Sequence, residues 1–323
     1  MNTETLPPTV DLGDGITCID TLQGRAGMAC CYLLQRGQDL AFIEAGTAHG
    51  VPRLLALLRQ RGLSREQVRY VIPTHVHLDH AGGAGSLMAA LPAAQLVAHP
   101  RGARHLIDPS KLIAGATAVY GEAFVQAQYG EILPIPASRV IEAADGHEIR
   151  LGDDVLRFFD SPGHARHHFC VFDPLSQGFF TGDTFGLSYR EFDTARGPFL
   201  IPTTTPVQFE PEAWHATLDR LLAAEPRQMF LTHYGRVRNV KALAATLRQG
   251  IDDYVRIAGT LTTAADRHTQ LREAITTLAL QQLQAHGCTL DTSTQRDLLS
   301  TDMELNAQGL GVWLDQTNGR SGA

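Results

Sequence analysis

The 323-residue sequence contains no long apolar run and no leader-like start. A helix that crosses a bilayer needs about 20 consecutive, mostly apolar residues, and no stretch of this chain reaches that length. Residues 1–8 lack the basic start and the apolar run of a secretory signal. The sequence therefore predicts a cytoplasmic protein that has no membrane partner.

Positive charge is also scarce, because 27 lysines and arginines stand against 34 aspartates and glutamates and leave a net charge of −7. Proteins that bind nucleic acid through its phosphates carry a basic face. We therefore expect no nucleic-acid partner. The 44% of hydrophobic residues suffices for a large core, and the length predicts one core plus an extension.

Cysteine is rare and shows no metal-binding spacing. A closed structural zinc site usually needs cysteine pairs two to four residues apart, and no such pairs occur. Most of the five cysteines lie in apolar, strand-like segments, so we expect reduced and packed thiols. They are Cys18, Cys30, Cys31, Cys170 and Cys288.

The most informative segment that is present spans residues 75–80, with the sequence HVHLDH. It follows the β-branched and aromatic residues 68–72, which are typical of a buried strand. Four metal-capable side chains fall within six residues: His75, His77, Asp79 and His80. The pattern predicts a metal site on a strand-to-helix loop. The alternative is a loop whose histidines cap a helix or meet solvent.

The spacing inside this loop bears on how many ions it holds. In extended backbone His75, His77 and Asp79 share one face, whereas His80 faces away unless the chain turns there. Two adjacent ions would use both directions. Imidazole and carboxylate suit zinc, iron, manganese or nickel.

Three further polar residues stand where an apolar segment ends, and such ends commonly carry chemistry. They are His164 after residues 155–159, Asp183 after residues 178–182, and His233 after residues 228–232. His164 belongs to the sequence SPGH, which predicts a tight turn.

In this order the seven residues resemble the ligand set of the metallo-β-lactamase superfamily, over about residues 10 to 238. The resemblance implies an α+β fold, a four-layer αββα sandwich with a metal pair at the mouth between two sheets. It implies that the first ion is held by His75, His77 and His164, the second ion by Asp79, His80 and His233, and that Asp183 bridges the two ions.

The resemblance also divides the chain into a metallo-β-lactamase-like catalytic domain, residues 1–238, and a helical C-terminal extension, residues 239–323. Apolar residues recur at helical spacing from Asn239 onward. Glyoxalase II, which the chain resembles in its ligands and in Thr232-His233-Tyr234, has a helical extension too. The sequence leaves open whether the extension covers the sandwich, narrows the entrance or buries a homodimer interface.

The implied function is a binuclear metal-dependent hydrolase that acts on an ester, thioester or lactone of a small molecule. Two divalent ions, with zinc expected first and iron, manganese or nickel as alternatives, would lower the pKa of a shared water toward about 7. A metal-bound hydroxide would then be the nucleophile. Asp79 would orient that water or pass a proton, which makes Asp79 the candidate catalytic residue.

Two other functions stay open. Persulfide dioxygenases share the pattern His-x-His-x-Asp-His and use one iron, so a mononuclear iron oxidoreductase is the alternative, and a non-enzymatic metal-binding protein is the third. Gly186 stands where many lactonases have Tyr, Asp183 where classical β-lactamases have Cys, and His77 where flavodiiron proteins have Glu. These positions disfavour the three corresponding activities.

Support for the ligands is predicted from acidic residues near them. A ligating histidine commonly donates its other ring N–H to a carboxylate or carbonyl, and Glu44 is the first candidate acceptor and Asp160 the second. Glu44 could equally be a surface acid at a strand end. His167 and His168 follow His164 closely, but strand alternation turns one of them inward and one outward, which favours packing over metal binding.

Two segments are candidates for the substrate entrance. Residues 98–111, AHPRGARHLIDPSK, resemble an uncharacterised, mostly prokaryotic branch of the superfamily, and their basic residues either bind an anion or form a structural cap. The loop of residues 185–209 leaves directly from Asp183, so we expect it to border the cleft. Tyr189 and Arg190 are its candidate substrate contacts. The alternative is a loop packed by its own Phe and Pro residues.

Overall fold

The computed structural model describes residues 6–204, 207–262 and 264–321. The chain forms two compact units. Unit 1 comprises residues 1–160, 167–182 and 226–238, and unit 2 comprises residues 161–166, 183–225 and 239–323. Across the described residues, no helix combines the length and the hydropathy that a membrane crossing requires.

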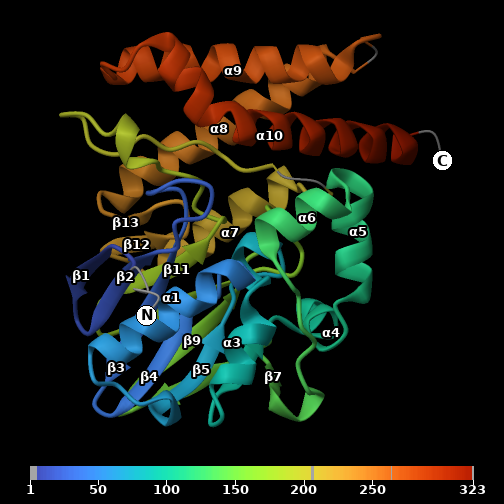
Figure 1. Ribbon diagram of the computed structural model, residues 1–323. Helices are drawn as coiled ribbons and strands as arrows, with labels where there is room; N and C mark the ends of the chain where they lie inside the picture. Colours follow the sequence, from blue (N-terminus) through green and yellow to red (C-terminus); the bar gives the residue numbers. More distant parts are fainter. Residues whose placement is uncertain (1–5, 205–206, 263, 322–323) are drawn as a thin grey trace. The chain divides into compact units, whose positions relative to one another are not determined.

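The first sheet of unit 1 has seven strands in chain order: β1 (Thr9–Gly13), β2 (Ile16–Asp20), β3 (Cys30–Arg36), β4 (Asp39–Ile43), β5 (Val68–Ile72), β6 (Gln95–Ala98) and β7 (Val140–Glu142). Strands β1 to β4 are antiparallel, and β4 to β7 are parallel (Figure 1). The first four strands therefore form a meander.

Parallel strands need crossover connections, and helices supply them here. The first connection, from β4 to β5, contains η1 (Ala48–Gly50), α1 (Val51–Gln60) and η2 (Arg65–Gln67). The second, from β5 to β6, contains α2 (Leu78–Ala81) and α3 (Ala84–Ala90). The third, from β6 to β7, contains α4 (Pro100–Ile107), α5 (Ser110–Tyr120), α6 (Glu122–Tyr129) and η3 (Ala137–Arg139).

The second sheet of unit 1 has six strands: β8 (Glu148–Leu151), β9 (Asp154–Asp160), β10 (Phe169–Asp173), β11 (Gly178–Gly182), β12 (Gln228–Leu231) and β13 (Gly235–Val237). Its pairs are antiparallel except β11 with β12, which are parallel. Strands β9, β11 and β12 correspond to the three apolar segments predicted ahead of His164, Asp183 and His233.

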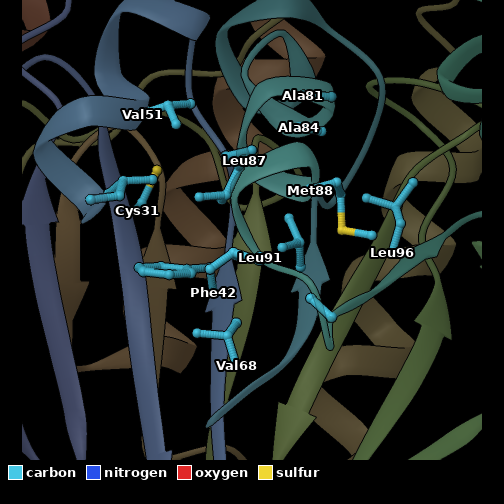
Figure 2. Packing of buried hydrophobic residues seen from close by; sticks show 14 of the residues in the cluster. Cys31, Phe42, Val51, Val68, Ala81, Ala84, Leu87, Met88, Leu91 and Leu96 are labelled. Carbon is cyan, nitrogen blue, oxygen red and sulfur yellow. The ribbon is translucent and has the colours of Figure 1, made fainter. Parts of the chain in front are cut away.

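Side chains on the two faces of β3 enter two different cores, as strand alternation requires. Cys31 and Leu33 join a cluster between the first sheet and helices α1 and α3. In Figure 2, Val51, Leu87 and Met88 from those helices lie over Phe42 and Leu96 of the strands. Cys30, Tyr32 and Leu34 instead join a cluster with Phe158, Phe169, Phe180 and Phe230 of the second sheet.

A buried ion pair also connects the two sheets of unit 1. Arg36 ends β3, and its guanidinium lies 2.7 Å from Asp154 on β9 and 2.9 Å from Asp173 on β10. The Arg36 side chain is 4% exposed and that of Asp173 is 0% exposed. Because a buried guanidinium needs charged partners, the three residues fix how these sheets meet.

Unit 2 is built from helices and one long loop. The loop follows Asp183 and contains η4 (Arg190–Phe192), and the helices are α7 (Pro211–Ala223), α8 (Val240–Thr260), α9 (Arg267–His286) and α10 (Thr292–Ser321). Helices α9 and α10 run side by side (Figure 1). The predicted change to helices after Asn239 is confirmed, since α8 begins at Val240. The division into domains at residue 238 stays a prediction.

Candidate metal centre

The loop of residues 75–80 does not stay extended along its whole length, because it turns into a short helix after His77. His77 is the N-cap residue of α2 and has an extended backbone. Helix α2 begins at Leu78, so Asp79 and His80 lie within its single turn. This turn brings Nε2 of His80 to 3.4 Å from Oδ2 of Asp79. His80 therefore does not face away from the other candidates.

The histidines of this loop lie close to one another. Nε2 of His75 and Nδ1 of His77 are 2.8 Å apart, and the ring centroids of His75 and His80 are 4.0 Å apart. Neutral imidazoles each offer one acceptor nitrogen. A cation is the group that can satisfy several such nitrogens at one point.

His233 joins this loop from the end of the second sheet. It follows Thr232 after β12, and its Nε2 lies 3.2 Å from Oδ2 of Asp79. Asp79, His80 and His233 each offer a ligand atom within 4.8 Å of the others, a geometry that could hold a metal ion. His80 and His233 are buried, whereas the Asp79 side chain remains 26% exposed.

The electrostatics of Asp79 favour its ionised form. Burial raises the pKa of Asp79, but the neighbouring imidazoles of His80 and His233 lower it by more, so the pKa lies well below its ordinary value. A carboxylate that stays ionised at neutral pH is the form that binds a cation.

Glu44 supports the ligand candidates from the end of β4. Its Oε1 accepts hydrogen bonds from Nδ1 of His80 at 3.0 Å, from Oγ1 of Thr74 at 2.6 Å and from Oγ1 of Thr232 at 2.9 Å, and its Oε2 accepts from the Thr74 amide at 3.1 Å. Glu44 is 1% exposed and has a left-handed φ of 65°. The prediction that Glu44 accepts from one of the candidate ligand histidines is confirmed, and the surface-acid alternative is wrong.

The predicted tight turn at His164 is present in unit 2. Gly163 has a φ of 138°, and a Cβ there would lie 2.4 Å from Cβ of Trp214 on α7. Glycine alone tolerates both conditions. The turn presents His164, 0% exposed, with its Nε2 3.6 Å from Oδ2 of Asp183. Unit 2 thus brings together the two remaining ligand candidates.

The ring nitrogens of these histidines match the requirements of a metal site. Nδ1 of His80 bonds to Glu44, Nδ1 of His233 lies 2.8 Å from the Met28 carbonyl, and Nδ1 of His164 lies 3.0 Å from the Thr203 carbonyl. An acceptor on Nδ1 fixes the tautomer that presents Nε2 as a ligand atom. The residues present therefore fit a divalent metal ion.

His167 and His168 lie beside the loop histidines. The ring centroid of His168 is 4.7 Å from that of His75, and the ring centroid of His167 is 5.5 Å from that of His77. His168 is fully buried and His167 is half-buried, so one of the two side chains turns inward, although both lie in the turn before β10 and not in a strand. The stacked arrangement of His75 and His168 agrees with a packing role.

The stretch of residues 98–111 acts in part as a structural cap. His99 accepts the Arg101 amide at the start of α4 through Nδ1, and its Nε2 lies 2.9 Å from Oδ1 of Asp160. Asp108 accepts the Ser110 amide at the start of α5. Asp160, the second candidate support for a ligand, thus contacts His99, and the cap interpretation is confirmed for His99.

The two candidate substrate contacts have partners within unit 2. The Tyr189 hydroxyl donates to Oδ1 of Asp302 on α10 at 3.2 Å, and Tyr189 is 2% exposed. Arg190 donates to the Ser188 carbonyl and lies 3.3 Å from Asp193. These contacts fix the loop, and a role in binding substrate stays a prediction.

Sequence reasoning gave no supporting role to Thr203, which accepts from His164, or to Thr232, which donates to Glu44. Thr232 stands next to His233, so a search of the residues flanking each ligand could have found it. Thr203 is far from His164 in sequence, and no local signal marks it.

Comparison with known proteins settles the family. The family model described as the metallo-beta-lactamase superfamily matches residues 24–233, a range that includes all seven ligand candidates. The chain belongs to the metallo-β-lactamase superfamily. The expected α+β fold class, with C-terminal helices, is confirmed by the observed elements and by the similarity to solved structures of this superfamily.

Among solved structures, the chain is similar to the archaeal superfamily protein ST1585 from Sulfolobus tokodaii, with a TM-score of 0.62 and 22% identity, over 88% of this chain and 93% of that one. It is also similar to the family protein TTHA1429 from Thermus thermophilus, with a TM-score of 0.63 and 18% identity, over 90% and 89% of the two chains. At these identities the likeness shows the fold alone.

Curated relatives are similar at low identity. The metallo-beta-lactamase fold-containing protein of Sulfurisphaera tokodaii is 26% identical over 65% of this chain and 74% of its own length. A hydroxyacylglutathione hydrolase of Maricaulis maris is 32% identical over 34% of this chain and 31% of its own length. The acyl-coenzyme A thioesterase MBLAC2 of Bos taurus is 26% identical over 53% of this chain and 64% of its own length.

Proposed function

We propose that this protein is a binuclear metal-dependent hydrolase that cleaves an ester, thioester or lactone of a small molecule. The observation that carries the proposal is the cluster of Asp79, His80 and His233, whose ligand atoms gather within 4.8 Å while Glu44 orients His80. Family membership supports a metallohydrolase in general.

The proposal assigns the ligands as the family resemblance implies. Within unit 1, Asp79, His80 and His233 gather, and within unit 2, His164 and Asp183 lie together. The set consists of His75, His77, Asp79, His80, His164, Asp183 and His233. We propose zinc as the first ion to test, since iron, manganese and nickel accept the same ligands.

Bound divalent ions would supply Lewis acidity, which makes water a nucleophile at neutral pH and polarises an acyl carbonyl. Asp79 would orient the attacking water, because it is ionised and partly exposed while the histidines beside it are buried. Glu44, through His80, would keep the ligand nitrogens in place during the reaction.

Thioesters are the first substrates to test. Two of the similar proteins are named as thioesterases, the acyl-coenzyme A thioesterase of Bos taurus and the atrochrysone carboxyl ACP thioesterase of Aspergillus fumigatus, which is 26% identical over 47% of this chain. A cytoplasmic location and a homodimer stay predictions.

The deciding experiment measures metal content by elemental mass spectrometry and turnover of thioester, ester and lactone panels. We expect two divalent ions per chain, hydrolysis, and loss of metal and turnover in His233→Ala. His215→Ala is the matched control, because His215 on α7 pairs with Asp252 on α8. One iron per chain with oxygen uptake on a persulfide would replace the hydrolase by the oxidoreductase alternative. No bound metal would overturn both.

A further inference from the structure

Asn306 is a buried amide on the largely apolar inner side of α10. It is 1% exposed, and its helix neighbours Met303 and Leu310 are buried too. An amide taken out of water costs free energy unless its donors and acceptor are hydrogen-bonded. The partners of Asn306 therefore show what this residue does.

Those partners flank a single residue of the loop that follows Asp183. Oδ1 of Asn306 accepts from the Thr204 amide at 2.6 Å, and its Nδ2 donates to the Pro202 carbonyl at 3.1 Å. The Thr204 hydroxyl lies 3.1 Å from both Oδ1 and the backbone carbonyl of Asn306. One side chain thus holds the backbone on both sides of Thr203.

Thr203 carries this constraint to a ligand candidate. Its carbonyl lies 3.0 Å from Nδ1 of His164, and its hydroxyl lies 2.5 Å from the same nitrogen. Thr203 and His164 are 2% and 0% exposed. The tautomer with the proton on Nδ1 donates to these oxygens and presents Nε2 on the side of Asp183.

We infer that Asn306 is a positioning residue for the metal ligand His164. By fixing residues 202–204, it fixes the tautomer and the direction of the His164 imidazole, and it makes α10 of the C-terminal extension part of the support of the metal centre. The inference rests on the proposed function, since it concerns the same ions.

If Asn306 only stabilised the fold, its loss would lower the melting temperature without changing metal affinity. The described backbone on either side of Thr203 has no ladder of its own beyond the bridge between Leu187 and Ile201. In the absence of a strand partner, the amide of Asn306 takes the place of the neighbouring strand. Support of this kind around a ligand typically changes metal affinity by about 10- to 100-fold.

The test compares two buried amides of the same helix. Asn306→Leu removes the bonds to the loop with little change in volume, and Gln295→Leu removes the bond from Nε2 of Gln295 to the Leu290 carbonyl. Gln295 is 7% exposed. Its described hydrogen bonds run to the carbonyls of Leu290 and Asp291, immediately before α10. Both variants should lower the melting temperature.

Only Asn306→Leu should change the metal centre. We expect competition with a chromogenic chelator to show about 10- to 100-fold weaker binding of one of the two ions, and wild-type binding of both ions in Gln295→Leu. In the metal-free protein, nitrogen NMR of the imidazoles should show that His164 loses its single tautomer in Asn306→Leu and keeps it in the control.

Thr204→Val is the milder variant if Asn306→Leu fails to fold, because it removes only the hydroxyl bonds and should weaken the same ion less. Wild-type affinity for both ions and a single His164 tautomer in the folded variants would overturn the inference alone. Equal weakening of both ions would overturn it as well. A wild-type protein that binds no ion would overturn the proposed function together with it.

Discussion

His80 in unit 1 and His164 in unit 2 are equally buried but are held in different ways. His80 bonds to the carboxylate of Glu44, which also accepts from Thr74 and Thr232 at neighbouring strand ends. His164 bonds to neutral oxygens of Thr203, whose backbone depends on α10. Hydrogen bonds with an ionised partner are roughly twice as strong as neutral ones. The first support is compact and charged, and the second is extended and neutral.

The largest effect should come from Glu44→Ala, which breaks the charged support. It leaves two hydroxyls, an amide and an imidazole nitrogen in a buried place without their acceptor, which should lower the free energy of unfolding by more than about 3 kcal/mol. Urea denaturation measures the change. Glu148→Ala is the control, since Glu148 pairs with Arg157 at the surface and should cost less than about 1 kcal/mol. Equal changes in both variants would remove the special role of Glu44.

The next effect concerns the turn before His164. In Gly163→Ala the new Cβ would meet Cβ and Cα of Trp214 at 2.4 and 2.6 Å, at a φ of 138°. We expect a loss of about 2–4 kcal/mol in unfolding free energy, from overpacking and backbone strain together. Gly197→Ala separates the two causes, because Gly197 has a φ of 99° but no atom within 4 Å of a new Cβ. A loss as large in Gly197→Ala would assign the effect to strain alone.

The smallest effect concerns Gly102, next to the candidate ligand loop of unit 1. Gly102 on α4 faces Val76, which lies between two ligand candidates, and a Cβ at Gly102 would lie 2.8 Å from Cγ1 of Val76. Because that methyl is the end of a side chain, Gly102→Ala should cost only about 1–2 kcal/mol. Weaker metal binding, measured with the chelator, should accompany the loss if α4 braces the loop.

Two further variants test whether Val76 is the residue that resists a methyl group at position 102. Gly115→Ala on α5 meets no atom within 4 Å and should stabilise its helix by roughly 0.5–1 kcal/mol. In a Val76→Ala background the contact is gone, so Gly102→Ala should then cost almost nothing. A cost that persists in the double variant would show that Val76 is not the residue that resists the new methyl.

The ligand candidates could be found from sequence because their signal is local. His75, His77, Asp79 and His80 fall within six residues, and the other candidates follow apolar strands directly. The direction of His80 could not be decided, because strand alternation and the start of α2 give opposite answers at the same residue. The choice for Glu44 stayed open for a similar reason, since its burial depends on donors from Thr74 and Thr232.

The support of His164 could not be predicted in the same way. Asn306 lies on a helix whose sequence shows almost no apolar periodicity, so no pattern marks which of its polar residues are buried. Its partners Pro202 and Thr204 lie in an irregular loop, whose backbone bonds no periodic pattern specifies. Tyr189 illustrates the same difficulty, because its hydrogen bond to Asp302 of α10 joins residues that lie far apart in the sequence.

The ion pair of Arg36 with Asp154 and Asp173 has a consequence for the response of unit 1 to salt. Dissolved ions screen charges that they can approach, with a Debye length of about 8 Å at physiological ionic strength. Arg157 and Glu148 are half exposed, so added salt weakens their attraction. Arg36 and Asp173 are closed off from solvent. The attraction between Arg36 and Asp173 therefore keeps its strength over a range of ionic strength in which the surface pairs lose theirs.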